Sequence, residues 1–335
     1  MPEKLTLALV GCGAISEWHR VAIRNVPELE ITAAVDVDRG RAEAAAAQSG
    51  AQVFTSLDEA LAHGTFDAVV LMLPHDLHES AAVACFEAGK HVLLEKPMAT
   101  DTDACDRILA AARRATTVFM LAENAQYWPE VLLAREQIAA GAIGEIVTAH
   151  VHLFFPPLDA FYGDERAWRM NRRQTGGGIC IDAGSHYIRP LRLWLGEIDE
   201  VVAAMESPYE RMEGESLARA LFRFRSGHVV SYNLMLTEAP TARQDVFRIT
   251  GTRGEIVIGL VDVTLYNAEN VSGVRVGADV PQGYFLSYEG QFRDFAGAVL
   301  RGTPLAATAE YALGELRTAL AMERSARTKR WEKVW

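Results

Sequence analysis

A carboxylate and an imidazole lie four residues apart in the segment GGGICIDAGSHYIRPLRLWLG, residues 176–196, as Asp182 and His186. If this mostly apolar segment is helical, positions four apart share one face. A carboxylate beside an imidazole fixes the tautomer of the ring and raises its basicity, which suits a general base next to a substrate. The same residues would also suit a hydrogen-bonded pair in a domain core, and the segment alone leaves both interpretations open.

Pro190 complicates the helix that would carry this pair. A proline inside a helix has no N–H, and its ring clashes with the carbonyl four residues earlier, which belongs to His186. Either the helix kinks here, or it begins at Pro190. In the second case His186 would lie on a turn, close to Asp182 but not on a shared helical face.

A second motif, GCGAIS at residues 11–16, follows an apolar run and precedes an expected helix. In this position Gly11 permits a tight turn, and Gly13 lets the backbone approach a pyrophosphate. A helix beginning with Ala14 and Ile15 would offer free N–H groups and the positive end of its dipole to phosphate. The motif predicts a dinucleotide site; the alternative is a glycine turn that binds nothing.

Asp36 ends the next apolar run, where an acid can accept hydrogen bonds from the ribose hydroxyls of a dinucleotide. A carboxylate at this position would repel the 2′-phosphate of NADP, so NAD is the predicted cofactor. Arg39 lies nearby and could soften that preference, which keeps NADP open as a second cofactor.

These motifs need a scaffold, and residues 5–121 alternate short apolar runs with Ala-rich helical segments. Near-continuous apolar strands separated by helices are typical of a parallel sheet covered on both faces. Right-handed crossovers would make it a doubly wound α/β domain. The expected strands are residues 5–10, 30–37, 66–73 and 90–95, and the expected helices are residues 14–25, 38–50 and 75–89.

Composition excludes several other classes of protein. The 335 residues, half of them apolar, are enough for two domains. A net charge of −11 and only a short basic cluster, RAWRMNRR at residues 166–173, make nucleic-acid binding unexpected. The four scattered cysteines show no metal-site spacing, so reduced thiols and no metal are predicted.

Membrane insertion and secretion are not expected either. No apolar run approaches the roughly 20 residues that a membrane-spanning helix needs. The N-terminal stretch MPEKLTLALVGCG runs straight into the glycine turn and lacks the length and cleavage site of a signal peptide. We interpret it as the first strand of a cytoplasmic protein.

Lys96 completes the set of motifs, in the segment GKHVLLEKPMAT. It follows Glu95 and precedes a proline at the carboxyl end of an expected parallel strand, where ligands of open α/β sheets bind. Here the chain resembles the GFO/IDH/MocA family, which includes glucose–fructose oxidoreductase and inositol dehydrogenase. The matching pieces, in the family's order and spacing, are GCGAIS, Asp36, PHDLHESAAVACFEAGKHVLLEKP, AENAQYWPEVLLAREQIAAGAIGEI, GGGICIDAGSHYIRPLRLWLG, ITGTRGEI and YEGQFRDF.

The resemblance implies a Rossmann domain over residues 1–122 and an α+β domain over residues 123–335 with a large, mostly antiparallel sheet. Similar proteins often use that sheet for dimer or tetramer contacts, so a homodimer or homotetramer is expected. The second half of the chain is compatible with this fold. Its β-rich runs are residues 145–155, 199–205, 217–237 and 244–260, and its last helix is residues 309–328.

The resemblance also implies catalytic roles for Lys96, Asp182 and His186. In similar enzymes the lysine touches both the nicotinamide ribose and the substrate, and the acid and histidine lie beside the reacting hydroxyl. His186 would take or give the hydroxyl proton near neutral pH. Lys96 would stabilise developing alkoxide charge, and Asp182 would hold the ring and bind a neighbouring sugar hydroxyl.

Further cofactor contacts are implied at Pro74, His78 and Glu95, beside Lys96. His78 matches a histidine that recurs in the family at a helix start, although a capping or packing role would also explain it. The lysine is therefore expected to serve both the cofactor and the substrate.

Substrate contacts are expected from Tyr127, and from Tyr162, Trp168 and Arg169 on the long Pro- and Gly-punctuated loop of residues 154–178. Aromatic rings paired with a guanidinium suit polyol recognition, but they also suit a plain surface loop. Trp128, next to Tyr127, would fit either the pocket or the core.

Two positions depart from the family pattern. Gln126 and Tyr127 stand where relatives often have an Arg-Phe pair, and Arg189 stands where they often have an acid. We interpret Arg189 as a surface residue, with recognition of a substrate carboxylate or phosphate as the alternative.

The predicted function is an NAD(P)-dependent oxidoreductase acting on a secondary alcohol or ketone of a sugar, cyclitol or glycoside. A lyase or glycoside-cleaving enzyme that oxidises its substrate transiently would use the same residues. A non-catalytic NAD-binding sensor is the third alternative, although a sensor has no need for a proton-transfer group.

Overall fold

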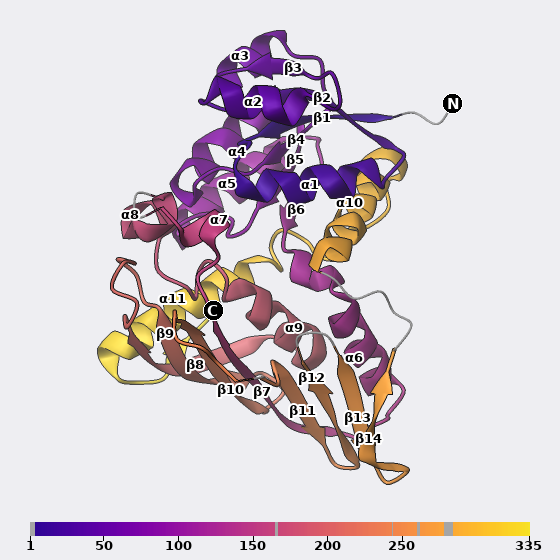
Figure 1. The fold of residues 1–335 in the computed structure, drawn as a ribbon, viewed down its shortest axis with the longest axis vertical. Helices are drawn as coiled ribbons and strands as arrows, with labels where there is room; N and C mark the ends of the chain where they lie inside the picture. Colours follow the sequence, from indigo (N-terminus) through magenta and orange to yellow (C-terminus); the bar gives the residue numbers. More distant parts are fainter. Residues whose placement is uncertain (1–3, 165–166, 243, 260–261, 278–283) are drawn as a thin grey trace. The chain divides into compact units, whose positions relative to one another are not determined.

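The computed structural model describes residues 4–164, 167–242, 244–259, 262–277 and 284–335. Arg166 of the short basic cluster and Leu260 at the end of the last β-rich run lie outside these residues. The chain forms two compact units, one of residues 1–124 and 287–313 and the other of residues 125–286 and 314–335 (Figure 1). Residues 287–313 thus belong to the first unit. The predicted division, with one boundary at residue 122, places them in the second domain.

The first unit is built on a parallel sheet of six strands in the order β3-β2-β1-β4-β5-β6, which confirms the predicted doubly wound α/β fold. Strand order reverses between β1 and β4, and ligands of such sheets bind at the carboxyl ends of the strands at this point. The strands are β1 (Leu5–Val10), β2 (Leu29–Val35), β3 (Gln52–Phe54), β4 (Ala68–Leu71), β5 (His91–Glu95) and β6 (Phe119–Ala122). The helices are α1 (Ala14–Arg24), α2 (Arg39–Ala46), α3 (Leu57–His63), η1 (His75–Leu77), α4 (His78–Glu87), α5 (Thr102–Arg114) and most of α10 (Tyr284–Arg301).

Burial and capping explain why these elements form. Every residue of β4 is buried, as expected for a strand covered on both faces. Asp38, Ser56 and Asp101 cap α2, α3 and α5 with side-chain oxygens that accept from the first N–H groups of each helix. Helix α1 differs, because it begins after Gly13 without a side-chain cap.

The second unit contains a sheet of nine strands in the order β14-β13-β12-β11-β7-β10-β9-β8-β15. Its pairings are antiparallel apart from the parallel pair β7–β10, which confirms the predicted mostly antiparallel sheet. The strands are β7 (Ile146–Phe155), β8 (Ile198–Glu206), β9 (Leu217–Phe224), β10 (Val229–Leu236), β11 (Phe247–Gly251), β12 (Gly254–Ile258), β13 (Val263–Asn267), β14 (Asn270–Val276) and β15 (Glu332–Lys333). The helices are η2 (Asn124–Tyr127), α6 (Pro129–Ala139), α7 (Asp159–Tyr162), η3 (Trp168–Met170), α8 (Arg172–Thr175), α9 (Ser185–Leu195) and α11 (Leu313–Thr328).

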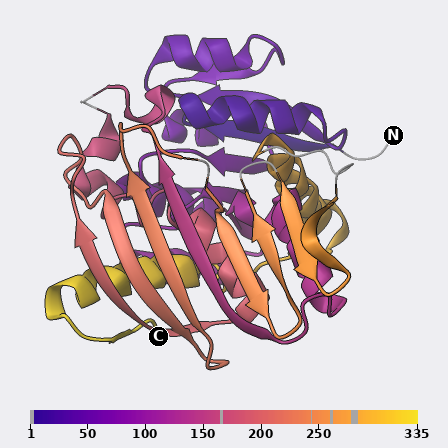
Figure 2. The same ribbon diagram turned by 60° about the horizontal axis from the view of Figure 1, so that its bottom comes forward.

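This sheet has one covered face and one open face. Tyr187 and Trp194 of α9 pack on the ring of Phe247, whose side chain is buried on the covered face. Figure 2 shows the opposite face toward the viewer, without a described helix of this unit over it. Along β9 the residues of this open face alternate with buried ones, the pattern of an antiparallel sheet covered on one side. Of the helices that the structure describes, none has the length and apolar character needed to span a membrane.

Candidate active site

The glycine turn after β1 has the geometry that a dinucleotide needs. Gly11 has a φ of +89°, and a Cβ atom there would lie 2.4 Å from the carbonyl oxygen of Met72, so the turn requires glycine. A Cβ atom at Gly13 would meet nothing within 4 Å, and the uncapped first turn of α1, with Ala14 and Ile15, follows directly. Open space beside free N–H groups fits the pyrophosphate of NAD, which would accept hydrogen bonds from them.

Asp36 ties the end of the second strand to this turn. One carboxylate oxygen accepts a hydrogen bond from the backbone N–H of Cys12 at 2.8 Å, and the other accepts from the N–H of Asp38 at 2.9 Å. A carboxylate has about four lone-pair sites, so acceptors remain for ribose hydroxyls. Arg39 forms an exposed ion pair with Glu43 at 3.1 Å, and a pair of this kind is too weak to keep Arg39 from a 2′-phosphate.

The thiol of Cys12 should be unreactive in the native protein. Burial, and then the negative charge of Asp36, raises the pKa of Cys12 to about 11. Because the thiolate is the nucleophile, we expect iodoacetamide at pH 8 to modify Cys12 about a hundredfold more slowly in the folded protein than in urea. Peptide mass spectrometry over time measures both rates, and equal rates would contradict this assignment.

Lys96 directly follows β5 and is half-buried. Buried Glu95 accepts the backbone N–H of Lys96 at 3.1 Å, and its other oxygen lies 2.6 Å from Nε2 of His19 on α1. The fully buried ring of His19 stands edge-on to Tyr288 and Phe292 of α10. Glu95 therefore orients the start of the lysine segment, and His19, which the sequence motifs do not predict, orients Glu95.

His78 connects two backbone segments of the first unit. Its ring is fully buried, with Nδ1 2.8 Å from the carbonyl oxygen of Pro97 and Nε2 2.9 Å from that of Leu73. Burial lowers the pKa of His78, which favours the neutral ring. A neutral imidazole donates to only one of these carbonyls at a time. These are the contacts of a packing residue, and a direct cofactor contact from His78 or half-buried Pro74 stays a prediction.

Asp182, in the second unit, is buried and engaged by two side chains of the long loop. Its carboxylate accepts a hydrogen bond from the hydroxyl of Tyr162 at 2.9 Å and pairs with Nε of Arg169 at 3.2 Å. The guanidinium of Arg169 in turn lies over the rings of Trp168, at 4.3 Å, and Phe161, at 4.8 Å. The structure thus brings together four residues for which substrate contacts were predicted: Asp182, Tyr162, Arg169 and Trp168.

The predicted helical face shared by Asp182 and His186 is wrong. Residues 179–184 form successive turns, and α9 begins only at Ser185. The N–H of Gly184 donates to the carbonyl of Ile179, five residues earlier, at 2.8 Å, and a Cβ atom at Gly184 would lie 2.4 Å from the carbonyl oxygen of Cys180, so this stretch is not a regular α-helix. His186 lies in the first turn of α9, and Pro190 is inside the helix rather than at its start.

His186 is buried against an aromatic side chain. Its ring lies 5.9 Å from the ring of Trp128, tilted by 41°, and Trp128 also stands edge-on to Tyr187 at 5.7 Å. Trp128 therefore belongs both to the core and to the surroundings of the predicted proton-transfer group. Tyr127, the residue before it, is half-buried at the end of η2.

The surface interpretation of Arg189 is wrong. Its side chain is 1% exposed, and Nε and Nη2 donate to the two carboxylate oxygens of Glu315 at 2.8 and 2.9 Å. Nη1 donates to Oε1 of Gln126 at 3.0 Å. The guanidinium is buried because α11 supplies an acid opposite it, and a substrate anion would have to compete with that internal partner.

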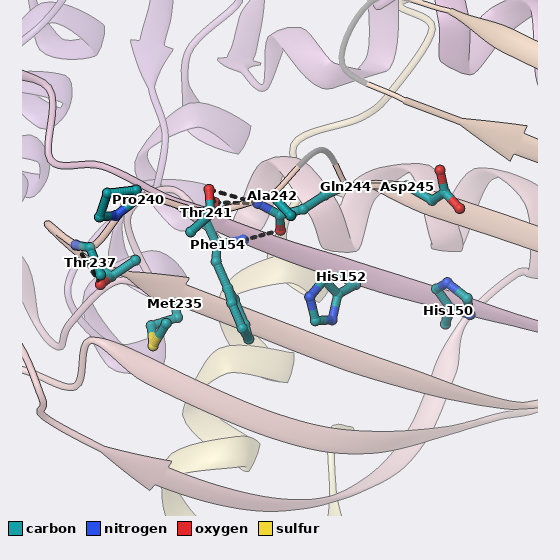
Figure 3. A pocket seen from close by; sticks show the side chains of 11 residues that line it. His150, His152, Phe154, Met235, Thr237, Pro240, Thr241, Ala242, Gln244 and Asp245 are labelled. Carbon is teal, nitrogen blue, oxygen red and sulfur yellow. Dashed lines mark hydrogen bonds between the residues drawn. The ribbon is translucent and has the colours of Figure 1, made fainter.

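A hollow of about 550 Å³ lies elsewhere in the second unit, on the open face of the sheet (Figure 3). His150, His152 and Phe154 of β7 and Met235 of β10 are among the residues that line it. These side chains alternate with the buried ones that face α9. The hollow is therefore separate from the surroundings of Asp182, which lie on the covered side.

The first unit has the strand order of a Rossmann fold, with the glycine turn after β1 and the uncapped start of α1 at the reversal of that order. Together these features define a Rossmann dinucleotide-binding protein. Two family models match the chain: "Oxidoreductase family, NAD-binding Rossmann fold" over residues 5–123, and "GFO/IDH/MocA C-terminal domain" over residues 131–257. The chain belongs to the GFO/IDH/MocA family, which confirms the resemblance and the prediction of NAD as cofactor.

Known relatives cover nearly the whole chain. The 1,5-anhydro-D-fructose reductase of Ensifer adhaerens is 29% identical, over 96% of this chain and 96% of that one. An oxidoreductase structure from Thermotoga maritima is 30% identical with a TM-score of 0.88, over 99% of both chains. The WlbA dehydrogenase of Bordetella pertussis, solved with NADH and UDP-GlcNAcA, is 26% identical with a TM-score of 0.87, over 99% of this chain and 98% of that one. The protein is therefore an NAD-dependent oxidoreductase.

Proposed function

We propose that the protein transfers a hydride between bound NAD and a secondary alcohol or ketone of a sugar, cyclitol or glycoside. The observation that carries this proposal is the buried group at the start of α9, where Asp182 is held by Tyr162 and Arg169 and His186 packs on Trp128. A hydrogen-bonded carboxylate among aromatic rings suits a polyol, and a nearby imidazole suits proton transfer. The anhydrosugar and nucleotide-sugar names of the relatives support the same substrate class.

Each residue would have a separate role in this reaction. Bound NAD would supply or accept the hydride. Lys96 would stabilise negative charge on the reacting oxygen, His186 would hold or release its proton, and Asp182 would bind a neighbouring hydroxyl. Lys96 belongs to the first unit and the other two residues to the second, so their convergence on one carbon is part of the proposal.

A substrate panel tests this function directly. We expect absorbance at the reduced-nicotinamide band to change when the protein meets its substrate among anhydrosugars, hexoses, inositols and UDP-linked uronates, with NAD or NADH. Cleavage of a glycoside with NAD recovered in its starting redox state would favour the lyase alternative instead. Tight binding of NADH without turnover on any member of the panel would favour the sensor.

The preference for NAD over NADP should depend on the negative charge of Asp36, directly after β2. In the double variant Asp36→Asn/Val37→Arg, an amide oxygen still accepts from the N–H of Cys12, and Val37, which is 91% exposed, has room for a guanidinium. The variant no longer has a carboxylate that repels the 2′-phosphate of NADP, and the new arginine can form a charge-assisted hydrogen bond to this phosphate of about 1.5–3 kcal/mol. The ratio of kcat/KM for NADP to kcat/KM for NAD should therefore rise by roughly tenfold to a hundredfold. Val37→Arg alone is the matched control and should shift it less; an unchanged ratio in the double variant would contradict the role of Asp36.

Assembly and location stay predictions. Leu221 and Val229 are 42% and 39% exposed on the open face of the sheet, which supports that face as the contact surface of the predicted homodimer or homotetramer.

A further inference from the structure

Helix α9 is tied to two other segments by a buried chain of charged and polar groups. Arg189 binds both oxygens of Glu315 on α11 and also donates to Gln126 in η2. Arg192, one turn further along α9, also donates to Glu315 and forms a second ion pair with Glu197 at 2.6 Å. All of these groups belong to the second unit.

The burial of this network favours a role in geometry over one in stability. The side chains of Arg189, Arg192 and Glu315 are 1%, 0% and 4% exposed. Taking an ion out of water costs several kcal/mol, and apolar residues of similar volume are often as stable in such places. A guanidinium bound through two parallel N–H groups adds direction, because it holds its partner in one plane.

The N–H groups in the first turn of α9 bond to the turns before it: those of His186 and Tyr187 donate to the carbonyls of Ala183 and Gly184 at 3.2 and 3.0 Å. Gly184 provides no side-chain cap, and Pro190 has no N–H to offer the carbonyl of His186. Arg189 lies three residues after His186, so its two bonds to Glu315 add a side-chain anchor to this turn.

A second connection runs through Gln126. This residue is 5% exposed and lies two positions before Trp128, whose ring packs 5.9 Å from that of His186. The bond from Arg189 to Gln126 therefore joins the helix that carries the histidine to the segment that packs against its ring.

We propose that Arg189 is a positioning residue for His186. By binding Glu315 and Gln126 at once, it fixes the imidazole against Trp128 at the angle that proton transfer requires. The inference rests on the proposed function, in which His186 moves the proton. This role also explains why the guanidinium of Arg189 is buried, although the sequence predicts a surface residue there.

The test compares Arg189→Met with Arg192→Met. Both variants remove a buried guanidinium that binds Glu315. Arg189→Met removes two bonds to Glu315 and the bond to Gln126, whereas Arg192→Met removes one bond to Glu315 and the ion pair with Glu197. We expect both to lower the melting temperature. Arg189→Met should in addition lower kcat by about ten- to a hundredfold with KM for NAD unchanged, because a displacement of about 1 Å at a reacting group can cost that much. In Arg192→Met, kcat should stay within about threefold of wild type.

Two further variants keep the inference testable where Arg189→Met does not fold. Gln126→Leu leaves the ion pair with Glu315 in place and should lower kcat by a smaller factor. Arg189→Lys keeps the charge without the planar fork and should restore only part of the activity. Parallel losses of kcat in Arg189→Met and Arg192→Met, or an unchanged kcat in Gln126→Leu, would overturn the proposal.

A readout without substrate separates this inference from the proposed function. In protein carrying ¹³C-labelled histidine, the Cε1–H signal of His186 is the one of nine that disappears in His186→Asn. We expect this signal to shift in Arg189→Met and Gln126→Leu but not in Arg192→Met. If the signal does not move in Arg189→Met and Gln126→Leu, the positioning role of Arg189 is overturned, even if turnover is found. If the signal shifts but the protein turns over no substrate, the positioning role stands and the result counts against the proposed function.

Discussion

Replacing His186 by Asn should lower kcat by about 10²–10⁴-fold, the usual contribution of a general acid or base. Asparagine keeps a polar group of similar size at this position, but it cannot accept or release a proton near neutral pH. The affinity for NADH should stay within about twofold, because His186 belongs to the second unit and the glycine turn to the first. Steady-state turnover on the best substrate, together with NADH fluorescence titration, measures both effects.

His63→Asn is the matched control for this variant. His63 is exposed at the end of α3, so the same chemical change there should leave turnover and NADH binding as in wild type. Wild-type turnover in His186→Asn would remove the proton-transfer role from this residue. It would also remove the reason for a positioning network around α9.

The Rossmann half could be predicted because its signals are local. An apolar strand, a turn that requires Gly11 at positive φ, and a helix that begins after Gly13 follow one another within residues 5–24. The residue types of each piece can be recognised from its sequence neighbours, and Lys96 likewise follows directly from the end of the strand before it. These features follow from residue types and spacing without knowledge of the rest of the chain.

The surroundings of α9 could not be predicted because distant residues create them. Arg189 resembles a surface residue until Glu315, 126 positions later, is placed opposite it. The tight turns before α9 depend on Gly178 as well, where a Cβ atom would lie 2.0 Å from the carbonyl oxygen of Glu215. The buried carboxylate of Glu215 accepts the N–H of Gly178 at 2.9 Å. Helical periodicity in the sequence carries no information on such a partner.

His19 was missed for the same reason, although a weak signal was present. It lies three residues after Ser16, one turn into α1, where a side chain faces the sheet. Its partner Glu95 is 76 positions away on β5, so only the parallel sheet brings them together. A polar residue on the buried face of this helix is a signal for a buried hydrogen-bond partner, which here is Glu95.

Lys96→Met should lower kcat/KM by about 10²–10³-fold, since removing one group that stabilises transition-state charge typically costs that much. Methionine keeps most of the side-chain length and loses only the ammonium, so the backbone bond from Lys96 to Glu95, and through it the contact with His19, should persist. We therefore expect the melting temperature and NADH binding to change little while turnover falls. Arginine at this position should restore part of the activity, because it returns the positive charge with a different shape.

Lys4→Met is the control for the loss of a lysine from the same unit. Lys4 is 54% exposed and pairs with Glu30 at 3.0 Å just before β1, at the end of the parallel sheet opposite to Lys96. An exposed ion pair of this kind contributes about 0–1 kcal/mol, so Lys4→Met should turn over as wild type does. If Lys96→Met kept wild-type kcat/KM as well, no ammonium would be needed at the reacting oxygen, and the reaction would have to rely on His186 and Asp182 alone.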